Sequence, residues 1–446
     1  MKTRLGEDVT VVRSDFKWFG PSLPHSTMFT VLRYYGVSDR WIGFFKKALE
    51  APMQFIDDGP DAPVQVRKRG TPISGPLSDM LGESVLFCLD FAFNQRTNGV
   101  FLWRLHDDIW FWGDKSTCET GWNVMTEFAE LMGLDFAEDK TGSVQIAASG
   151  SESTLTSSSV LPAGDVVWGF LKLDAKSGRF VINQKQVDKH IKELSLQLSS
   201  CKCVFDWIQA WNIYASRFFS TNFGSPANCF GRAHVDEILE TFEKIQKQLF
   251  TNEGDNVTSV IKKMLSDRFD IQDIPEGYIY FPSSLGGLEV KSPFIKPILV
   301  RESLPASPQI YMDDFFRNEA RVYKDAKEEF ESRPVKKPHY AQGHEVNDSV
   351  EFFTFEEYTR YREFKSFELS EVFDLLMAEP RPRYLEYFEG NRCEYNRYDD
   401  PYHRWIMQLY GGEMVRRFGG LNVVQPGLLP MGMVTMFKKS RFQWRD

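Results

Sequence analysis

The stretch VFLWRLHDDIWFWG, residues 100–113, constrains the fold more than any other part of the chain. Two apolar, aromatic-rich runs flank His106-Asp107-Asp108, and Asn98-Gly99 precedes the first run. Aromatic and β-branched runs of this length favour strands, and the polar residues between them favour a turn. We therefore predict a β-hairpin with Asp107 and Asp108 at its tip.

A third acidic residue ends an earlier predicted strand. The segment DVTVVRSD is β-branched, alternates weakly and ends at Asp15. If this strand lies beside the hairpin, Asp15, Asp107 and Asp108 come together, and their mutual repulsion beside tryptophan rings favours a bound divalent cation. Two-metal phosphoryl transfer needs carboxylates from two strands in this arrangement. The three residues are therefore predicted ligands of Mg²⁺ or Mn²⁺.

A second Asp-Asp pair lies at Asp313 and Asp314, within the letters YMDD. The pair follows Pro305 and Pro308 and precedes FFRNEARVYKDAKEEFESR, a strongly helical stretch. Acidic residues cap helix N-termini and favour the helix dipole there. The surroundings predict a helix start and not a metal site.

The remaining pattern predicts mixed α and β structure. A helix capped by Ser38 carries an apolar face of Trp41, Phe44, Phe45, Ala48 and Leu49, and another helix ends near Gly133. Residues 149–159 are rich in Ser and Thr, which is typical of a linker or loop. A second hairpin is predicted to turn at residues 176–178, and helices follow with apolar faces within 187–198 and 238–249.

Composition bounds the class of protein. A chain of 446 residues with 42% hydrophobic and 26% charged residues is typical of folded protein, and the length suggests about three domains. The start lacks an apolar signal segment, no run approaches a membrane span, and an intracellular location is expected. The net charge of −9 argues mildly against a nucleic-acid partner, although residues 65–70 and 185–202 are locally basic.

The order of segments resembles the palm of a reverse transcriptase over residues 9–173. SDFKWFGPSLPHSTMFTVLRYYGVSDRWIGFFKKAL is similar to motif A and the helices after it, and RGTPISGPLSDML to motif B. RLHDDIWFW resembles motif C, LMGLDFAEDKTG motif D and VVWGFLKL motif E. The wording of motifs A, B and C is most similar to the reverse-transcriptase-related cellular genes known as rvt.

The resemblance implies an α+β fold, a right-hand polymerase palm with an antiparallel sheet and helices. It implies a palm over 1–160, a motif E hairpin and helical thumb over 161–260, and a mostly helical C-terminal extension over 261–446. The implied activity is nucleotide addition to a 3′ end with Mg²⁺ or Mn²⁺. The implied partners are a nucleic-acid template and primer and nucleoside triphosphates, with no membrane and possible homo-oligomerisation.

The resemblance also assigns roles to individual residues. The implied catalytic residues are Asp15, Asp107, Asp108 and Lys140, with Lys140 as an acid for the leaving pyrophosphate. The implied nucleotide contacts are Phe16, Phe19, Gly20, Gly70, Pro72, Ile73 and Ser74. The implied nucleic-acid contacts are Arg67, Lys68, Arg69, Trp168, Gly169, Lys185 and Lys189.

Three departures from the family pattern carry information. Ile73 stands where the family commonly has Gln, which puts hydrogen-bonded help to the nucleotide in doubt. Gly20 stands where retroviral enzymes place a bulky aromatic against the 2′-hydroxyl, so ribonucleotides are expected to be accepted as well as deoxynucleotides. Only fourteen residues precede Asp15, where a fingers region is expected; the chain is therefore predicted to be part of a longer protein, a truncated product or dependent on a partner.

Other functions fit parts of the same pattern. A palm derivative could bind nucleic acid or act as a scaffold without polymerising, and a template-independent terminal transferase would use the same metal ligands. An HD-type phosphohydrolase would use His106-Asp107, but it needs a further upstream His on a helix, and only His25 precedes the pair. An assay of metal-dependent nucleotide addition distinguishes a palm derivative that does not polymerise from an active enzyme.

Overall fold

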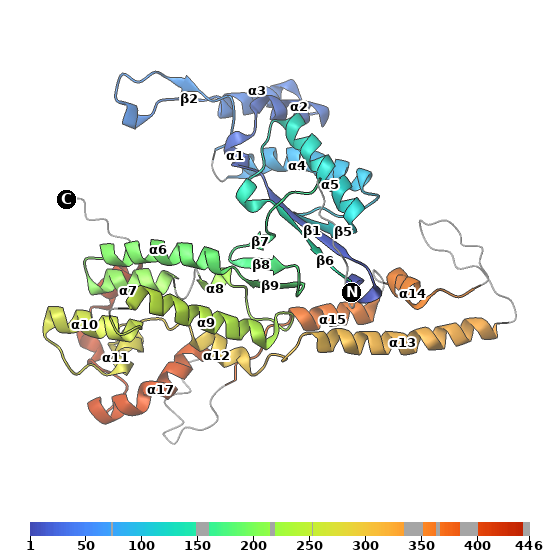
Figure 1. Cartoon of the computed structure of the whole chain (residues 1–446). Coiled ribbons are helices and arrows are strands. Elements are labelled where there is room, and N and C mark those ends of the chain that lie inside the picture. Colours follow the sequence, from blue (N-terminus) through green and yellow to red (C-terminus); the bar gives the residue numbers. More distant parts are fainter. Residues whose placement is uncertain are drawn as a thin grey trace. The chain divides into compact units, whose positions relative to one another are not determined.

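The computed structural model describes residues 1–72, 75–148, 160–214, 219–251, 253–333, 351–362, 366–383 and 400–439. The chain is α+β and forms two compact units (Figure 1). The first unit comprises Met1–Trp168 with Lys172–Phe180, and the second comprises Gly169–Leu171 with Val181–Asp446. The predicted linker at 149–159 lies outside the described residues.

The first unit is built on a four-stranded antiparallel sheet with the strand order β4-β5-β1-β6. Its strands are β1 (Val9–Asp15), β4 (Trp103–Leu105), β5 (Asp108–Gly113) and β6 (Gly142–Ile146). Helix α4 (Pro76–Arg96) leads into β4, and α5 (Lys115–Met132) connects β5 to β6. The order β-α-β-β-α-β with this strand arrangement is the split βαβ architecture. The predicted hairpin of β4 and β5 is confirmed.

Alternation along the strands gives the sheet two different faces. Val12, Ile109 and Phe111 are fully buried in the core that α4 and α5 complete. Phe111 meets Phe93 of α4 edge to face at 4.9 Å. The register places Asp15, Arg13, Asp108, Trp110 and Trp112 on the opposite face, since side chains of paired strands alternate together.

The predicted helix end at Gly133 is confirmed, whereas the start of α5 at Lys115 was not predicted from the sequence. Asp114 caps α5 by accepting a hydrogen bond from the Thr117 backbone N–H, and Gly133 ends the helix with a φ of 69°. Helix α3 (Asp39–Leu49) begins after Ser38, as predicted. Its predicted apolar face is not a core face throughout, because Trp41 and Phe44 are more than half exposed.

Shorter elements complete the first unit around the sheet. They are η1 (Lys2–Leu5), α1 (Phe19–Ser22), α2 (His25–Tyr34), β2 (Pro52–Met53), η2 (Ile56–Asp58), β3 (Gln65–Val66) and η3 (Glu138–Lys140). A three-stranded sheet of β7 (Val167–Trp168), β8 (Leu171–Asp174) and β9 (Arg179–Ile182) contributes residues to both units. The turn between β8 and β9 holds Lys176 and Gly178, which confirms the second predicted hairpin.

The second unit is helical apart from its share of that sheet. Its elements are α6 (Gln184–Ser200), α7 (Val204–Ile213), α8 (Phe219–Asn222), α9 (Gly231–Phe250), α10 (Val257–Phe269), α11 (Glu276–Tyr280), η5 (Ser283–Leu285), α12 (Ile295–Arg301), α13 (Gln309–Ser332), α14 (Phe355–Arg362), α15 (Phe367–Met377), α17 (Pro401–Phe418), η6 (Pro426–Leu428) and α18 (Met431–Lys439). The predicted apolar face of α6 is buried, and that of α9 is buried at Ile238, Phe242 and Ile245 but half-buried at Leu239 and Leu249. A separate apolar cluster joins α11, α12 and α17 around Phe281, Ile406 and Met414.

The second Asp-Asp pair lies on the long helix α13, as the sequence predicts, but it does not cap the helix. Helix α13 begins at Gln309 after Pro308, so Asp313 and Asp314 lie about one turn inside it. Asp314 instead accepts a hydrogen bond from Arg317 at 2.8 Å. Prolines fit the first turn of a helix, which explains why the helix starts earlier than the acidic pair.

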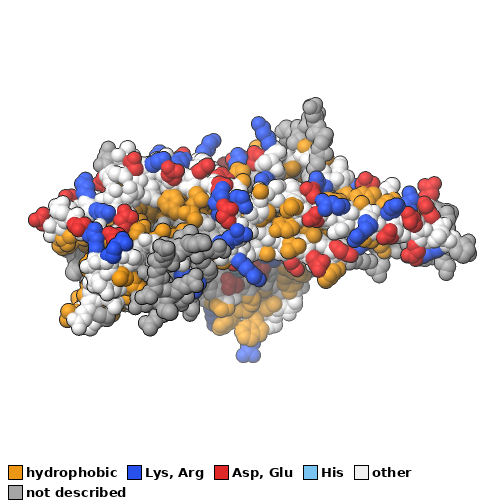
Figure 2. All heavy atoms as spheres, turned by 90° about the horizontal axis from the view of Figure 1, so that it is seen from below, with side chains coloured by type: hydrophobic (Ala, Val, Ile, Leu, Met, Phe, Trp, Pro, Cys, Tyr) orange, Lys and Arg blue, Asp and Glu red, His pale blue; other side chains and the backbone are white. Residues whose placement is uncertain are grey.

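The surface of the second unit is mixed in charge. On the face shown in Figure 2, acidic and basic side chains are interspersed, with hydrophobic side chains between them. Among the described residues, none of the helices combines the length and the apolar character that crossing a bilayer requires.

Candidate active site

The strand that ends at Asp15 lies directly beside the hairpin tip. Strands β1 and β5 pair antiparallel, and Asp15 is the register partner of Asp108. Opposite residues in such a pair lie with Cα atoms about 4.5–5.5 Å apart. Asp107 occupies the turn next to them. The prediction that the strand ending at Asp15 lies beside the hairpin carrying Asp107 and Asp108 is therefore confirmed.

The hairpin turn holds His106 in an unfavourable conformation. His106 has a φ of 54°, in the left-handed region that costs about 1 kcal/mol or more for a residue with a Cβ atom. Its Nδ1 lies 3.1 Å from Oε1 of Glu83 on α4. This contact anchors the turn to the helix and fixes the direction in which Asp107 and Asp108 leave it.

Asp15 is buried and paired with a cation. Only 4% of the residue is exposed, and its carboxylate accepts a hydrogen bond from the ammonium of Lys140. Hydrogen bonding to Asp15 raises the pKa of Lys140 above its ordinary value, and burial opposes this shift. Lys140 is therefore the resting counter-ion of Asp15.

Asp108 is held by Arg13, the residue two positions before Asp15 on the same strand. Arg13 Nη2 donates to Asp108 Oδ1 at 2.9 Å, and Nη1 donates to the Lys140 carbonyl at 3.1 Å. The guanidinium carbon lies 6.0 Å from the Trp110 ring centre and 5.8 Å from that of Trp168. The buried Arg13 thus joins β1, β5 and the turn before β6 in one cluster.

Asp107 differs from the other two carboxylates. Within the part of the chain that the structure describes, it alone of the three has no ion pair. Burial raises its pKa above the ordinary value, and the charges of Asp15 and Asp108 raise it further. The charge of Lys140 and a backbone hydrogen bond act in the opposite direction. A nearby cation would therefore stabilise the ionised form of Asp107 more than that of the two carboxylates already paired.

A cavity of about 240 Å³ opens beside Asp107. It is lined by residues of α1, α4, the hairpin turn and the loop before α4: Phe19, Gly20, Pro21, Leu23, Thr71, Pro72, Ser78, Asp79, Gly82, Glu83, His106 and Asp107. Three predicted nucleotide contacts, Phe19, Gly20 and Pro72, therefore share one cavity with a predicted catalytic carboxyl. Its lining contains the carboxylates of Asp79 and Glu83 but neither Lys nor Arg.

The turn around Gly70 builds one wall of this cavity. Gly70 has a φ of 82°, and a Cβ atom there would lie 2.6 Å from the Pro21 carbonyl oxygen, so only glycine fits. The Thr71 N–H donates to the Gly20 carbonyl at 3.0 Å. A Cβ on Gly20 would meet Thr71 Oγ1 at 3.5 Å, an ordinary contact. The predicted contacts Ile73 and Ser74 lie outside the described residues.

The two predicted aromatic contacts have different surroundings. Phe16 is 1% exposed, and its ring stacks on Phe136 at 5.1 Å within the core. Phe19 is also largely buried but lines the cavity, and its ring packs where a Cβ on Gly82 would stand, 3.1 Å away. The ring of Phe16 belongs to the core, whereas Phe19 is available to a bound molecule.

The predicted nucleic-acid contacts are distributed over both units. Arg69 donates to the carbonyls of Ser22 and Gly133, Arg67 is half-buried, and Lys68 is exposed. Trp168 packs beside Arg13 and Trp110 in the first unit. The second unit holds the rest: Gly169, with a φ of 56°, and the exposed Lys185 and Lys189 of α6. Arg69 makes both contacts through Nη1, and its role as a phosphate contact stays a prediction.

Sequence reasoning missed an acidic and basic network behind the hairpin. Arg104 of β4 donates to both carboxylate oxygens of Asp90, at 2.8 and 2.7 Å, and to Glu83 at 2.7 Å. Burial raises the pKa of Glu83, but hydrogen bonds from Arg104 and His106 outweigh it and leave the pKa lowered. A lone arginine inside the aromatic run VFLWRL was the signal that such partners exist on the helix.

The three carboxylates suit a divalent cation chemically, but two of them are already compensated by protein cations. No set of three or more His, Cys, Asp or Glu side chains among the described residues is arranged as a metal site. Lys140 and Arg13 occupy Asp15 and Asp108 instead. Carboxylate oxygens are the ligands that Mg²⁺ prefers, and the crowding that raises the pKa of Asp107 favours a cation there. Asp15 and Asp107 are therefore the side chains that could hold Mg²⁺.

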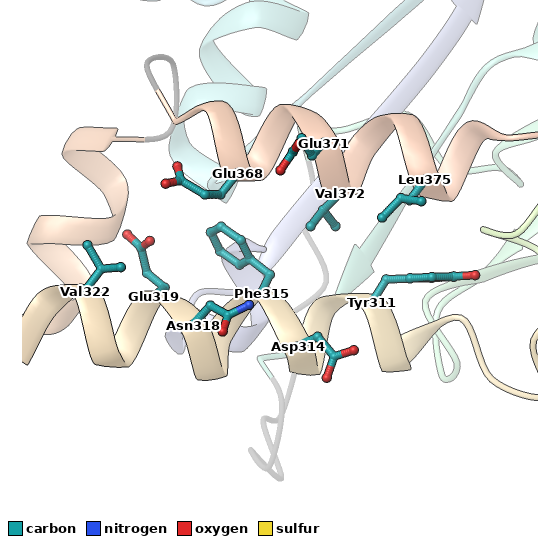
Figure 3. Close-up of a pocket in the computed structure, with 10 residues that line it drawn as sticks. All are labelled: Tyr311, Asp314, Phe315, Asn318, Glu319, Val322, Glu368, Glu371, Val372 and Leu375. Carbon is teal, nitrogen blue, oxygen red and sulfur yellow. The ribbon is translucent and has the colours of Figure 1, made fainter.

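A second cleft, of about 230 Å³, lies between α13 and α15 in the second unit. Figure 3 shows Phe315 and Val372 pointing toward one another across it. Asp314 of the second Asp-Asp pair also lines this cleft, with Glu319, Glu368 and Glu371. Glu319 is buried and accepts a hydrogen bond from Arg362 at 3.0 Å. This acidic group is held by an ion pair within the unit.

Comparisons with known proteins give weak structural likenesses. No protein-family model matches the chain, and no curated protein matches it. Apo telomerase from Candida tropicalis matches with a TM-score of 0.30 and 12% identity, over 65% of this chain and 46% of that one. Telomerase from Candida albicans, in complex with the TWJ fragment of telomeric RNA, gives 0.26 and 12%, over 59% and 47%.

The chain spans less than half the length of these telomerase chains. A truncated apo telomerase from Candida tropicalis gives a TM-score of 0.28 and 14% identity, over 40% of this chain and 36% of that one. Similarity at this level establishes neither the fold nor the activity of the chain.

Proposed function

We propose that the first unit is the palm of a reverse-transcriptase-like nucleotidyltransferase. The β1–β5 register carries this proposal, because it sets Asp15 opposite Asp108 with Asp107 beside a cavity. The split βαβ order of the sheet and the shared wall of Gly20, Thr71 and Pro72 support it. The chemistry is the addition of a nucleotide to a nucleic-acid 3′ end with release of pyrophosphate.

In this proposal Asp15 and Asp107 hold Mg²⁺ or Mn²⁺, and Asp108 is a supporting charge. A metal held there would supply activation of the attacking hydroxyl and charge stabilisation of the leaving pyrophosphate. Arg13 fixes the rotamer of Asp108 through their 2.9 Å hydrogen bond, which leaves Asp107 as the carboxylate of the pair that faces the cavity. Two adjacent aspartates thereby acquire different roles.

Lys140 has two roles that exclude one another. It neutralises Asp15 at rest, and in the reaction it would have to leave Asp15 to protonate the departing pyrophosphate. Its raised pKa makes it a weak acid while it is paired. The release of Lys140 from Asp15 is therefore part of activation.

The cavity wall at Gly20 has no bulk that would exclude a 2′-hydroxyl. Gly20 presents no side chain, and its neighbour Thr71 leaves only ordinary contact distance. We propose that ribonucleotides are accepted as well as deoxynucleotides. Because Asp79 and Glu83 line the cavity without a basic residue, the triphosphate depends on metal or on cations outside the lining.

The test is Mn²⁺- or Mg²⁺-dependent extension of a labelled primer with NTPs and dNTPs in parallel. Wild-type protein is expected to extend with both, and Asp107→Asn to extend with neither. Gly20→Tyr is expected to lose ribonucleotide incorporation while retaining deoxynucleotides. Strict exclusion of NTPs by wild-type protein would contradict the size argument, and extension by Asp107→Asn would contradict the site.

A second function is favoured by one observation. Arg13 and Lys140 neutralise Asp108 and Asp15 without metal, which suits a palm that binds nucleic acid but does not polymerise. In that case primer binding would persist and no nucleotide would be added with either metal. Extension by wild-type protein rules this alternative out.

A further inference from the structure

An exposed row of aromatic rings lies on the sheet of the first unit. Trp103 of β4 and Trp112 of β5 are stacked, with ring centres 5.9 Å apart and planes 13° apart. They are 56% and 44% exposed, and Phe101, 67% exposed, lies 6.4 Å from Trp103. We call Phe101, Trp103 and Trp112 the aromatic strip. Exposed strand faces are normally polar, so a strip of this kind indicates a binding surface.

The strip lies on the same face of the sheet as the carboxylates. Trp103 pairs with Trp110, and Asp108, Trp110 and Trp112 follow one another at two-residue steps along β5. At about 3.4 Å per residue, Trp112 stands about 14 Å along the strand from Asp108. A strand of nucleic acid whose end lies at Asp107 would cover this distance in a few nucleotides.

The β8–β9 hairpin covers the neighbouring part of this face and leaves the strip open. Phe180 and Trp168 lie 6.4 and 5.5 Å from Trp110, and a Cβ on Gly178 would stand 3.2 Å from Ile146. Phe180 of the hairpin therefore lies beside β5 and Gly178 beside the end of β6, while Trp103 and Trp112 stay exposed. The strands and turn of the hairpin carry three basic residues, Lys172, Lys176 and Arg179, and Lys172 pairs with Asp165 at 2.7 Å.

We propose that the aromatic strip binds the bases of a single-stranded nucleic-acid segment by stacking. This inference rests on the proposed function, which places the end of that segment at Asp107. Aromatic rings on a sheet stack bases regardless of sequence, and nearby cations track the phosphates. The hairpin supplies those cations, and the strip continues the face of the catalytic carboxylates. A protein partner on the same rings is the competing outcome.

The experiment measures binding without chemistry. Fluorescence anisotropy of a labelled 12-nucleotide single strand in EDTA compares wild-type protein with Trp103→Ala/Trp112→Ala. We expect the double variant to bind at least about tenfold more weakly, because stacking contributes about 1–3 kcal/mol per base. Trp103→Phe/Trp112→Phe keeps flat rings and is expected to retain most of the affinity. An abasic strand should bind both wild type and the alanine variant weakly.

A matched control comes from a different face of the same unit. Trp41 and Phe44 of α3 are 56% and 58% exposed and meet edge to face at 5.8 Å. Trp41→Ala/Phe44→Ala removes as much exposed aromatic surface away from the sheet and is expected to bind the strand as wild type does. Equal loss in both alanine variants would overturn the proposal, as would wild-type affinity in Trp103→Ala/Trp112→Ala.

Two further measurements test base binding by the strip independently of the proposed catalytic activity. Asp107→Asn is expected to lose primer extension and to keep binding in EDTA, so a failure of catalysis does not imitate a failure of stacking. Light scattering reports the mass of each variant. A change of oligomeric state in Trp103→Ala/Trp112→Ala, with strand affinity unchanged, would assign the strip to a protein contact and overturn base stacking.

Discussion

The two Asp-Asp pairs of the chain have different surroundings, because their hydrogen-bond partners lie at very different separations along the sequence. Asp108 is held by Arg13, 95 positions away, and Asp15 beside it is held by Lys140, 125 positions away. Asp314 is held by Arg317, one helical turn away on α13. A strand pair collects acidic groups from separate segments, whereas a helix turns successive residues about 100° apart. The candidate site therefore depends on strand β1, which brings Asp15 beside the pair, and not on the Asp-Asp sequence alone.

The largest expected difference between the two pairs is in activity. We expect Asp15→Asn and Asp107→Asn each to lower the rate of nucleotide addition by about a thousandfold or more, since each removes a ligand charge at the reacting phosphate. Asp313→Asn/Asp314→Asn should leave the rate within about twofold of wild type. Single-turnover primer extension measures both. Comparable losses in the two sets would remove the distinction.

The next effect is on stability and compares the two arginines. Arg13→Ala leaves Asp108 without its partner and removes a guanidinium packed between Trp110 and Trp168, so we expect a loss of about 3 kcal/mol in the free energy of unfolding. Arg317→Ala breaks an exposed helix pair and should cost less than about 0.5 kcal/mol. Urea titration followed by tryptophan fluorescence measures both. The cycle with Asp108→Ala isolates the pair, and a coupling near zero contradicts the account.

A third comparison concerns capping. Asp114 caps α5, and although burial alone would raise its pKa, hydrogen bonds from Thr117 and Ser116 lower it to about 2. A depressed folded pKa contributes stability above the ordinary value near 4 that is lost as the pH falls toward 2. Asp114→Ala should therefore cost about 1 kcal/mol at pH 7 and little at pH 2, whereas Asp314→Ala, which breaks an exposed pair with Arg317, should cost less than about 0.5 kcal/mol at pH 7. A destabilisation by Asp114→Ala that is independent of pH would refute the cap.

The smallest effect on the free energy of unfolding is expected for Asp107→Asn. Its raised pKa means that the fold disfavours the ionised form, so its contribution to stability improves as the pH falls through that pKa. Asp107→Asn should therefore be neutral or stabilising by less than about 1 kcal/mol, with solvent screening limiting the gain. Thermal unfolding at pH 7 checks this. Marked destabilisation would show that the carboxyl is structural and not poised for a ligand.

The sequence was sufficient where the signal is local. The strand ending at Asp15, the hairpin around Asp107 and the helix end at Gly133 follow from alternation and turn residues. It was insufficient where partners are remote, as in the contacts of Arg13 and Lys140. Packing also decided that Phe16 is buried while Trp41 is exposed, because ring burial depends on which elements meet and not on periodicity.

The most direct test of the central claim is Mn²⁺ binding by electron paramagnetic resonance. The account predicts one set of sites that is weakened at least about tenfold by Asp15→Asn and likewise by Asp107→Asn, because β1 and the hairpin tip contribute to the same ion. Asp313→Asn/Asp314→Asn should bind Mn²⁺ as wild type does. Unchanged Mn²⁺ affinity in Asp15→Asn would contradict a shared site and, with it, the proposed nucleotidyltransferase.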